Sequence, residues 1–348
     1  MKNGTERMQY IDCIRGIAVF FVVWGHFAGA LGCQTGDLLS KIITTFNMPL
    51  FAFLSGMLYR CRKDVPYYRV TVHKFRRLIV PVLCWNALAT LPKFLYKRGA
   101  MSIGVMTILG ESLDLWFLNS IFCVYIIYDL VCRISTTEKM SIVLNTLVIL
   151  GIWLIPSNLW HIGFLYPFFF IGCIIGAKIK GLVHRESAFL CFLIFCVYCL
   201  VLFTFTTDEY IYYSGTSLTI SKYSLLRQLY INLKRILLAL LAMNSIFWLY
   251  FERIENRKSM IKPIQGLCKW GQYSLDIYIM HVILVSYFLK TVLKKAFPML
   301  MQAPIWFEIV RDYVLSPVLT ILVIALCIEI SKFIGRKKLA GSLLLGKN

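Results

Sequence analysis

Charge is scarce in this sequence. Only 16% of its 348 residues are charged, against about 25% in a soluble domain, and 59% are hydrophobic. Acidic residues are especially few, since 17 Asp and Glu accompany 37 Lys and Arg. The apolar residues gather in runs of about 20, the length that crosses roughly 30 Å of hydrocarbon. We therefore predict an all-α, polytopic integral-membrane protein.

Several other features are missing. The first apolar run lacks a small-x-small cleavage site, so we expect a permanent span and not a signal peptide. There is no internal repeat and no loop large enough for a second domain, which predicts one integral-membrane domain over residues 1–348. The twelve cysteines lie mostly within apolar runs, where they act as small hydrophobes, so we expect neither a metal site nor a disulfide framework.

Hydropathy and charge together predict the topology. We expect ten spans, at about 10–31, 41–59, 78–92, 115–132, 140–156, 161–179, 187–206, 233–251, 272–290 and 313–334. With both termini in the cytoplasm, that side carries 24 Lys and Arg against 12 on the other, as the positive-inside rule requires. The net charge of +20 therefore reflects short basic loops, and we expect no nucleic-acid partner.

Ionisable residues interrupt the first span. Arg15 and His26 are eleven residues apart, about three helical turns, so they share a face roughly 16 Å apart along the axis. Asp12 falls near the same stripe. Intramembrane ionisable groups are costly and usually mark a functional path. Histidine can take a proton from a hydroxyl, although a histidine that is simply hydrogen-bonded within the bundle is the alternative.

A dense basic loop follows the second span. It contains seven Lys and Arg, and five of these are candidates for phosphate binding: Arg60, Arg62, Lys74, Arg76 and Arg77. Guanidinium groups bind phosphates in a bidentate manner, which suits a nucleotide-bearing donor such as coenzyme A. Ordinary positive-inside anchoring remains the alternative.

Three further segments contain polar residues near or within spans. Asn47 begins a stretch with a proline and the pair Ser55-Gly56, for which we favour helix packing. Asp114 and Trp116 either belong to an aromatic belt or suit a sugar, whose apolar face stacks on rings.

In the ninth span, Tyr278 and His281 are three residues apart and share a helix face. A second intramembrane histidine favours a polar interior.

Together these motifs resemble the membrane-bound acyltransferase family 3. The resemblance rests on Ile11-Asp-Cys-Ile-Arg15-Gly, the Arg-x10-His spacing, Met48-Pro-Leu-Phe-x-Phe-Leu-Ser-Gly56, Phe75-Arg-Arg-Leu-Ile-Val-Pro81, Leu115-Trp-Phe-Leu118 and Tyr273-Ser-Leu-Asp-Ile-Tyr-Ile-Met-His281. There are departures: the family's Arg-x-x-Arg is Lys74-x-x-Arg77 here, and Asp114 stands where histidine is common.

The resemblance implies O-acetylation of a cell-surface or exopolysaccharide sugar in a bacterial plasma membrane. Acetyl-CoA would be a co-substrate and no cofactor would be bound permanently. His26 would be the general base, Arg15 would hold the donor with Asp12 orienting it, and the basic loop would bind coenzyme A. Asn47, Ser55, Asp114, Trp116, Tyr278 and His281 would support the acceptor side.

Other interpretations stay open. The chain could instead move a lipid-linked glycan across the membrane, although no inverted repeat supports this. It could also transfer another acyl group such as succinyl, or act on a lipid-linked sugar and not a polymer. The oligomeric state is not indicated by the sequence.

Overall fold

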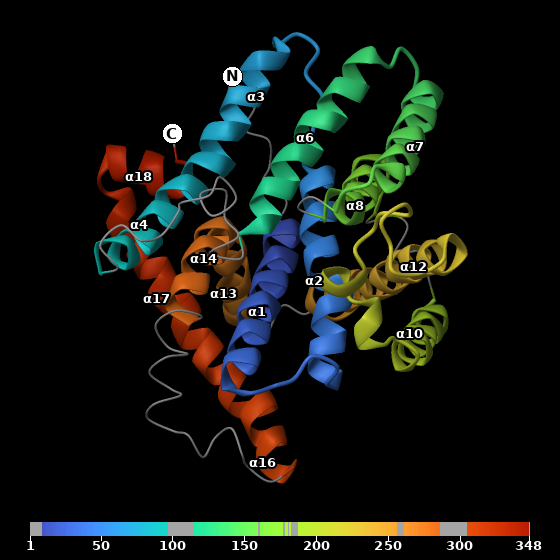
Figure 1. Ribbon diagram of the computed structural model, residues 1–348. Helices are drawn as coiled ribbons and strands as arrows, with labels where there is room; N and C mark the ends of the chain where they lie inside the picture. The colour runs from blue at the N-terminus through green and yellow to red at the C-terminus, as the bar shows by residue number, and fades with distance from the viewer. Residues whose placement is uncertain are drawn as a thin grey trace.

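The computed structural model describes residues 9–96, 115–158, 161–176, 178–179, 181, 187–255, 261–285 and 305–347. Within these residues the chain is a helical bundle without strands (Figure 1). The α-helices are α1 (Gln9–Leu31), α2 (Leu38–Met57), α3 (Tyr67–Lys74), α4 (Val80–Tyr96), α6 (Trp116–Ile134), α7 (Glu138–Leu154), α8 (Ile162–Ile175), α10 (Ala188–Phe203), α11 (Ile211–Ser214), α12 (Leu225–Leu249), α13 (Ile261–Gln272), α14 (Ser274–Val282), α16 (Ile305–Val310), α17 (Ser316–Gly335) and α18 (Lys338–Leu345). A 3-10 turn, η4 (Thr207–Glu209), and three π-helical segments, η1 (Phe75–Ile79), η5 (Tyr250–Glu255) and η9 (Arg311–Leu315), complete the described elements.

Five of these helical stretches are long and apolar enough to cross a membrane, judged by length and composition. They are Gln9–Leu31, Leu38–Met57, Trp116–Ile134, Leu225–Glu252 and Glu308–Gly335. Three shorter apolar helices cover Ile162–Ile175, Ala188–Phe203 and Ser274–Val285. The predicted all-α class is confirmed for the described residues, whereas the number of ten spans and the side of the termini stay predictions.

Several predicted boundaries were wrong. The helix predicted to begin near 233 begins at Leu225, because Lys234 and Arg235 are buried and paired within it and do not mark its end. The predicted loop 60–77 is helical from Tyr67 onward, through α3 and η1.

Likewise, the predicted loop 252–271 contains most of α13, an amphipathic helix that packs lengthwise on α1. An amphipathic helix of this kind has apolar residues on one face only. It therefore contains no long apolar run that would predict it from the sequence.

Two helix pairs cross with almost touching backbones. A Cβ on Gly16 would lie 2.0 Å from the Leu267 carbonyl oxygen, and one on Gly271 would lie 1.7 Å from the Asp12 carbonyl oxygen. Each helix thus presents a glycine to its partner's backbone, which brings α1 and α13 into close contact.

The crossing of α2 and α8 repeats this pattern. A Cβ on Gly56 would lie 2.0 Å from the Phe169 carbonyl oxygen, and one on Gly172 would lie 2.2 Å from that of Phe53. Gly56 is therefore a packing residue.

Prolines shape the helices that surround the core. Pro167 lies inside α8 and cannot donate to the carbonyl of Gly163, one turn earlier. The indole Nε1–H of Trp153 donates to that carbonyl oxygen at 2.9 Å, so α7 supplies the missing hydrogen bond. In α8, the side chains of Tyr166, Phe168 and Phe169 are completely buried. The core extends from the contacts of α8 with α2 and α6 to buried residues of α1, α12, α14 and α17.

Candidate active site

Two cavities open beside α1. The His26 cavity has a volume of about 400 Å³ and is lined by α1, α2, α6, α11 and α14, among other segments. The Arg15 cavity has a volume of about 740 Å³ and is lined by the α3–η1 region as well as α1, α2, α6 and α14. Among the described residues, the Tyr278 side chain lines both cavities. The face predicted on α1 therefore opens into two compartments that meet at Tyr278.

Between Arg15 and His26, α1 is held by a side chain of α2. With its amide oriented to satisfy both partners, Asn47 donates from Nδ2 to the Ala18 carbonyl oxygen at 3.0 Å. Its Oδ1 accepts from the Val22 N–H, also at 3.0 Å. Val22 is one turn before His26, so this contact fixes α1 close to the imidazole. Asn47 also lines the His26 cavity.

His26 contacts a second histidine. The rings of His26 on α1 and His281 on α14 have centroids 4.9 Å apart and meet edge to face at 66°. His281 is 0% exposed, and its Nδ1 lies 2.9 Å from the Ile277 carbonyl oxygen. Tyr278 lies between this pair and Phe117, with ring centroids 5.7 Å from His281 and 5.6 Å from Phe117. The predicted proximity of Tyr278 and His281 on one helix face is confirmed.

The Arg15 cavity is strongly basic. Its cationic lining residues are Arg15, Arg60, Arg62, Arg69, Lys74 and Arg77. The Nζ of Lys74 lies 3.5 Å above the centroid of the Tyr125 ring, so a cation–π contact directs it toward α6. His73 also lines this cavity, and burial together with the charges of Lys74 and Arg77 lowers its pKa from the ordinary 6.5. Such a surface attracts a polyanion.

A cluster of three aromatic rings lies at the His26 cavity. Trp116, His161 and Tyr212 contact one another edge to face, with ring centroids 5.0 to 6.0 Å apart. Trp116 and Tyr212 line the cavity itself. An amphipathic aromatic surface of this kind can pack against the apolar face of a sugar.

A buried ion pair anchors the segment that carries Tyr212. The Nζ of Lys234 lies 2.6 Å from Oε2 of Glu209, and both side chains are at most 5% exposed. Arg235 donates to the Glu209 and Gly215 carbonyl oxygens at 2.6 Å each. These bonds bracket α11 at both ends, which fixes the wall that this helix gives to the His26 cavity. Sequence reasoning missed this network because Glu209 is 25 residues from Lys234.

The predicted site residues separate into groups. His26, Asn47, Trp116 and Tyr278 line the His26 cavity, and Arg15, Ser55, Arg60, Arg62, Lys74, Arg77 and again Tyr278 line the Arg15 cavity. Asp12 is buried at the crossing with α13, Arg76 is exposed, and His281 is buried behind His26; none of these three lines either cavity. Asp114 lies outside the described residues.

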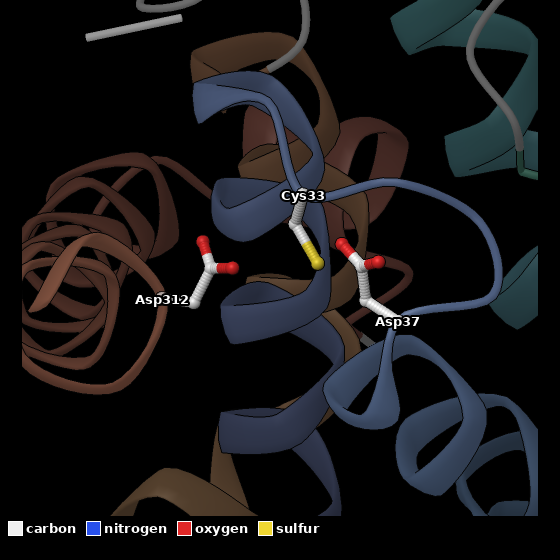
Figure 2. A group of neighbouring side chains, drawn as sticks. All are labelled: Cys33, Asp37 and Asp312. Carbon is white, nitrogen blue, oxygen red and sulfur yellow. The ribbon is translucent and has the colours of Figure 1, made fainter. Parts of the chain in front are cut away.

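A further cluster closes the end of the α1–α2 hairpin. Cys33, Asp37 and Asp312 place one thiol and two carboxylate atoms within 4.8 Å of one another, close enough to surround a metal ion (Figure 2). Arg311 donates to both carboxylate oxygens of Asp312, at 2.8 and 3.0 Å, and Asp37 accepts from the Gln34 N–H at 2.7 Å.

Burial and the two carboxylates raise the pKa of Cys33 to about 12. The bonds from Arg311 to Asp312 and from the Gln34 N–H to Asp37 fit a structural clasp between η9 and the hairpin.

Comparison with known proteins identifies related sequences. A family model described as an acyltransferase domain matches residues 8–331. Nodulation protein NolL of Sinorhizobium fredii (strain NBRC 101917 / NGR234) is 26% identical over 223 residues, which cover 60% of this chain and 61% of NolL. The chain thus matches less than two thirds of the length of that relative. No solved structure matches the chain.

Proposed function

Because the chain belongs to the acyltransferase family whose domain it matches, we propose that it transfers an acetyl group from acetyl-CoA to a sugar hydroxyl. The observation that carries this proposal is the pair of cavities, one basic and one aromatic, that meet at Tyr278 beside His26. A polyanionic donor and a hydroxyl-bearing acceptor would each have a compartment, and the acetyl group would cross where the two meet.

The reaction needs one base. His26 would take the proton of the sugar hydroxyl as its oxygen attacks the thioester carbonyl carbon. The C–O bond forms, the C–S bond breaks, and the proton passes from His26 to the departing thiolate to give coenzyme A. Asn47 would keep His26 in place through its bonds to α1.

The Arg15 cavity would hold the donor. Arginine and lysine provide charge-assisted hydrogen bonds to the several phosphates of coenzyme A, and Lys74 and Arg77 lie in the cavity wall. Arg15, about 16 Å from His26 along the helix, would bind the donor closer to the base than the loop residues do.

The His26 cavity would hold the acceptor. Its volume of about 400 Å³ and its Trp116 and Tyr212 rings suit one or two sugar units of a cell-surface or exopolysaccharide chain, free or lipid-linked. In a bacterial plasma membrane with both termini inside, the Arg15 cavity would face cytoplasmic acetyl-CoA and the His26 cavity the outer glycan. The ten-span topology predicted above belongs to this proposal.

The direct test is transfer of label. Purified protein in detergent is incubated with acetyl-labelled acetyl-CoA and a panel of bacterial glycans, and label in the sugar supports the proposal. We expect His26→Ala to lower the rate at least about 1000-fold, within reach of a base and the positioning that it requires. A folded His26→Ala protein that acetylates at the wild-type rate would refute the assignment of the base. Movement of a lipid-linked glycan across vesicles without labelling would instead favour a transporter.

The donor site is tested separately by coenzyme A affinity. Loss of one charged hydrogen bond costs about 1.5 kcal/mol, or roughly tenfold in affinity, so Lys74→Gln and Arg77→Gln are each expected to weaken binding about tenfold. Lys139→Gln is the control, because Lys139 is exposed on α7 and lines neither cavity. Equal affinity in all three variants would mean that the basic loop only sets topology.

A further inference from the structure

His281 has a buried nitrogen that has no hydrogen-bond partner among the residues that the structure describes. The side chain is 0% exposed, and its Nε2 forms no hydrogen bond within the described part of the chain. A buried polar atom left unsatisfied costs about 1–3 kcal/mol, so such an atom requires an explanation.

The other ring nitrogen settles the tautomer. Nδ1 lies 2.9 Å from the Ile277 carbonyl oxygen, one turn earlier on α14. A carbonyl oxygen only accepts hydrogen bonds, so Nδ1 carries the proton. The neutral ring therefore presents an unprotonated Nε2 with its lone pair, held in a fixed orientation by its own helix.

The neighbour of this ring is His26. The two imidazoles contact each other edge to face across the α1–α14 interface, with centroids 4.9 Å apart. His26 lines the cavity, whereas His281 lies behind it and lines neither cavity. The arrangement places a buried acceptor on the side of His26 away from the substrate.

We propose that His281 is a positioning residue, whose Nε2 accepts a hydrogen bond that His26 forms during the reaction. This inference rests on the proposed function. When His26 takes the hydroxyl proton, both of its nitrogens become donors. One points to the substrate oxygen and then to the departing sulfur, and the other donates to His281. His281 thus orients the base. Other enzymes also orient a catalytic base through a third group, often a carboxylate, and here that group would be a neutral imidazole ring.

Two substitutions separate this role from packing. In His281→Gln the terminal amide reaches the place of Nε2, so an acceptor remains beside His26. In His281→Asn the shorter amide reaches the place of Nδ1, so the bond to Ile277 remains and the acceptor beside His26 is lost. Both substitutions keep a neutral polar side chain, which makes them a matched pair.

The expected result is a split between the two variants. His281→Asn should lower kcat at least about tenfold with KM for acetyl-CoA unchanged, whereas His281→Gln should stay within about threefold of wild type. Equal kcat in the two variants, or a higher kcat in His281→Asn, would overturn the proposal, because packing favours the variant that keeps the Ile277 bond. If His281→Asn does not fold, His281→Leu takes its place as the variant without an acceptor.

The same assay includes His26→Ala, which tests the role of His26 as the base separately from the role of His281. An inactive His26→Ala protein with both His281 variants at the wild-type rate would leave the proposed function standing and remove the role of His281. An active His26→Ala protein would remove the base itself. Elution profile, unfolding temperature and coenzyme A affinity show that each variant is folded and binds its donor.

Discussion

Replacing Gly271 with alanine should separate α1 from α13. The new Cβ would lie 1.7 Å from the Asp12 carbonyl oxygen and 3.0 Å from the Gly16 nitrogen, and both atoms belong to backbone. A rotamer change cannot relieve such a clash. Asp12 is one helical turn before Arg15, so the strain acts directly on the part of α1 that lines the basic cavity.

The size of the effect follows from this distance. Cβ atoms essentially never approach a non-bonded heavy atom closer than 3.0 Å. The two helices must therefore separate locally by about 1.3 Å. Overpacking of this kind costs about 1–3 kcal/mol of stability. Misplacement of a site by about 1 Å can cost about 100-fold in rate. We therefore expect Gly271→Ala to lower kcat/KM for acetyl-CoA about 100-fold and to lower the unfolding temperature.

A control is available on the same helix. Gly266 has no atom within 4 Å of its Cβ position, so Gly266→Ala meets open space. Alanine is favoured over glycine in a helix by about 0.5–1 kcal/mol, which predicts unchanged activity and an equal or higher unfolding temperature. Acetyl transfer and thermal unfolding are measured for both variants in the same detergent. If Gly271→Ala matched Gly266→Ala in both measurements, the close crossing would not position Arg15.

Three other predictions use different parts of the structure. Bound phosphate favours the charged form of His73, so coenzyme A affinity should rise as pH falls through and below 6.5, and titration calorimetry should show a weaker pH dependence in His73→Gln. Lys234→Met should lower the free energy of unfolding in denaturant by about 3–5 kcal/mol, because the buried Glu209 carboxylate loses its ion pair with Lys234. The double variant Lys234→Met with Glu209→Gln should recover part of this loss. Tyr278→Ala should raise the rate of acetyl-CoA hydrolysis relative to the rate of transfer, because it opens the wall between the cavities, whereas Tyr278→Phe should not. An unchanged ratio of the two rates in Tyr278→Ala would mean that Tyr278 does not separate the cavities.

The sequence predicted local relations better than distant ones. Helical periodicity placed Arg15 and His26 on one face, and a three-residue spacing placed Tyr278 beside His281, since both relations lie within one helix. The meeting of His26 with His281 could not be predicted, because it depends on how α1 packs against α14.

Long-range pairing also explains the error at the start of α12. The span predicted at 233–251 begins beside Lys234 and Arg235, because charged residues are rare inside spans. Their partner Glu209 lies in a separate turn, and only the folded chain brings the three together. The sequence also grouped Arg76 with Arg77, whereas in the structure Arg77 lines the cavity and Arg76 does not, because consecutive side chains of the helical segment η1 point in different directions.

The shared wall at Tyr278 has a consequence for the order in which substrates bind. If donor and acceptor each occupy a compartment of their own, as proposed, they need not displace one another, and both can be bound before any bond changes. Steady-state rates should then give intersecting and not parallel double-reciprocal lines. Coenzyme A should inhibit competitively against acetyl-CoA but not against the glycan, and a non-reactive sugar should show the reverse behaviour.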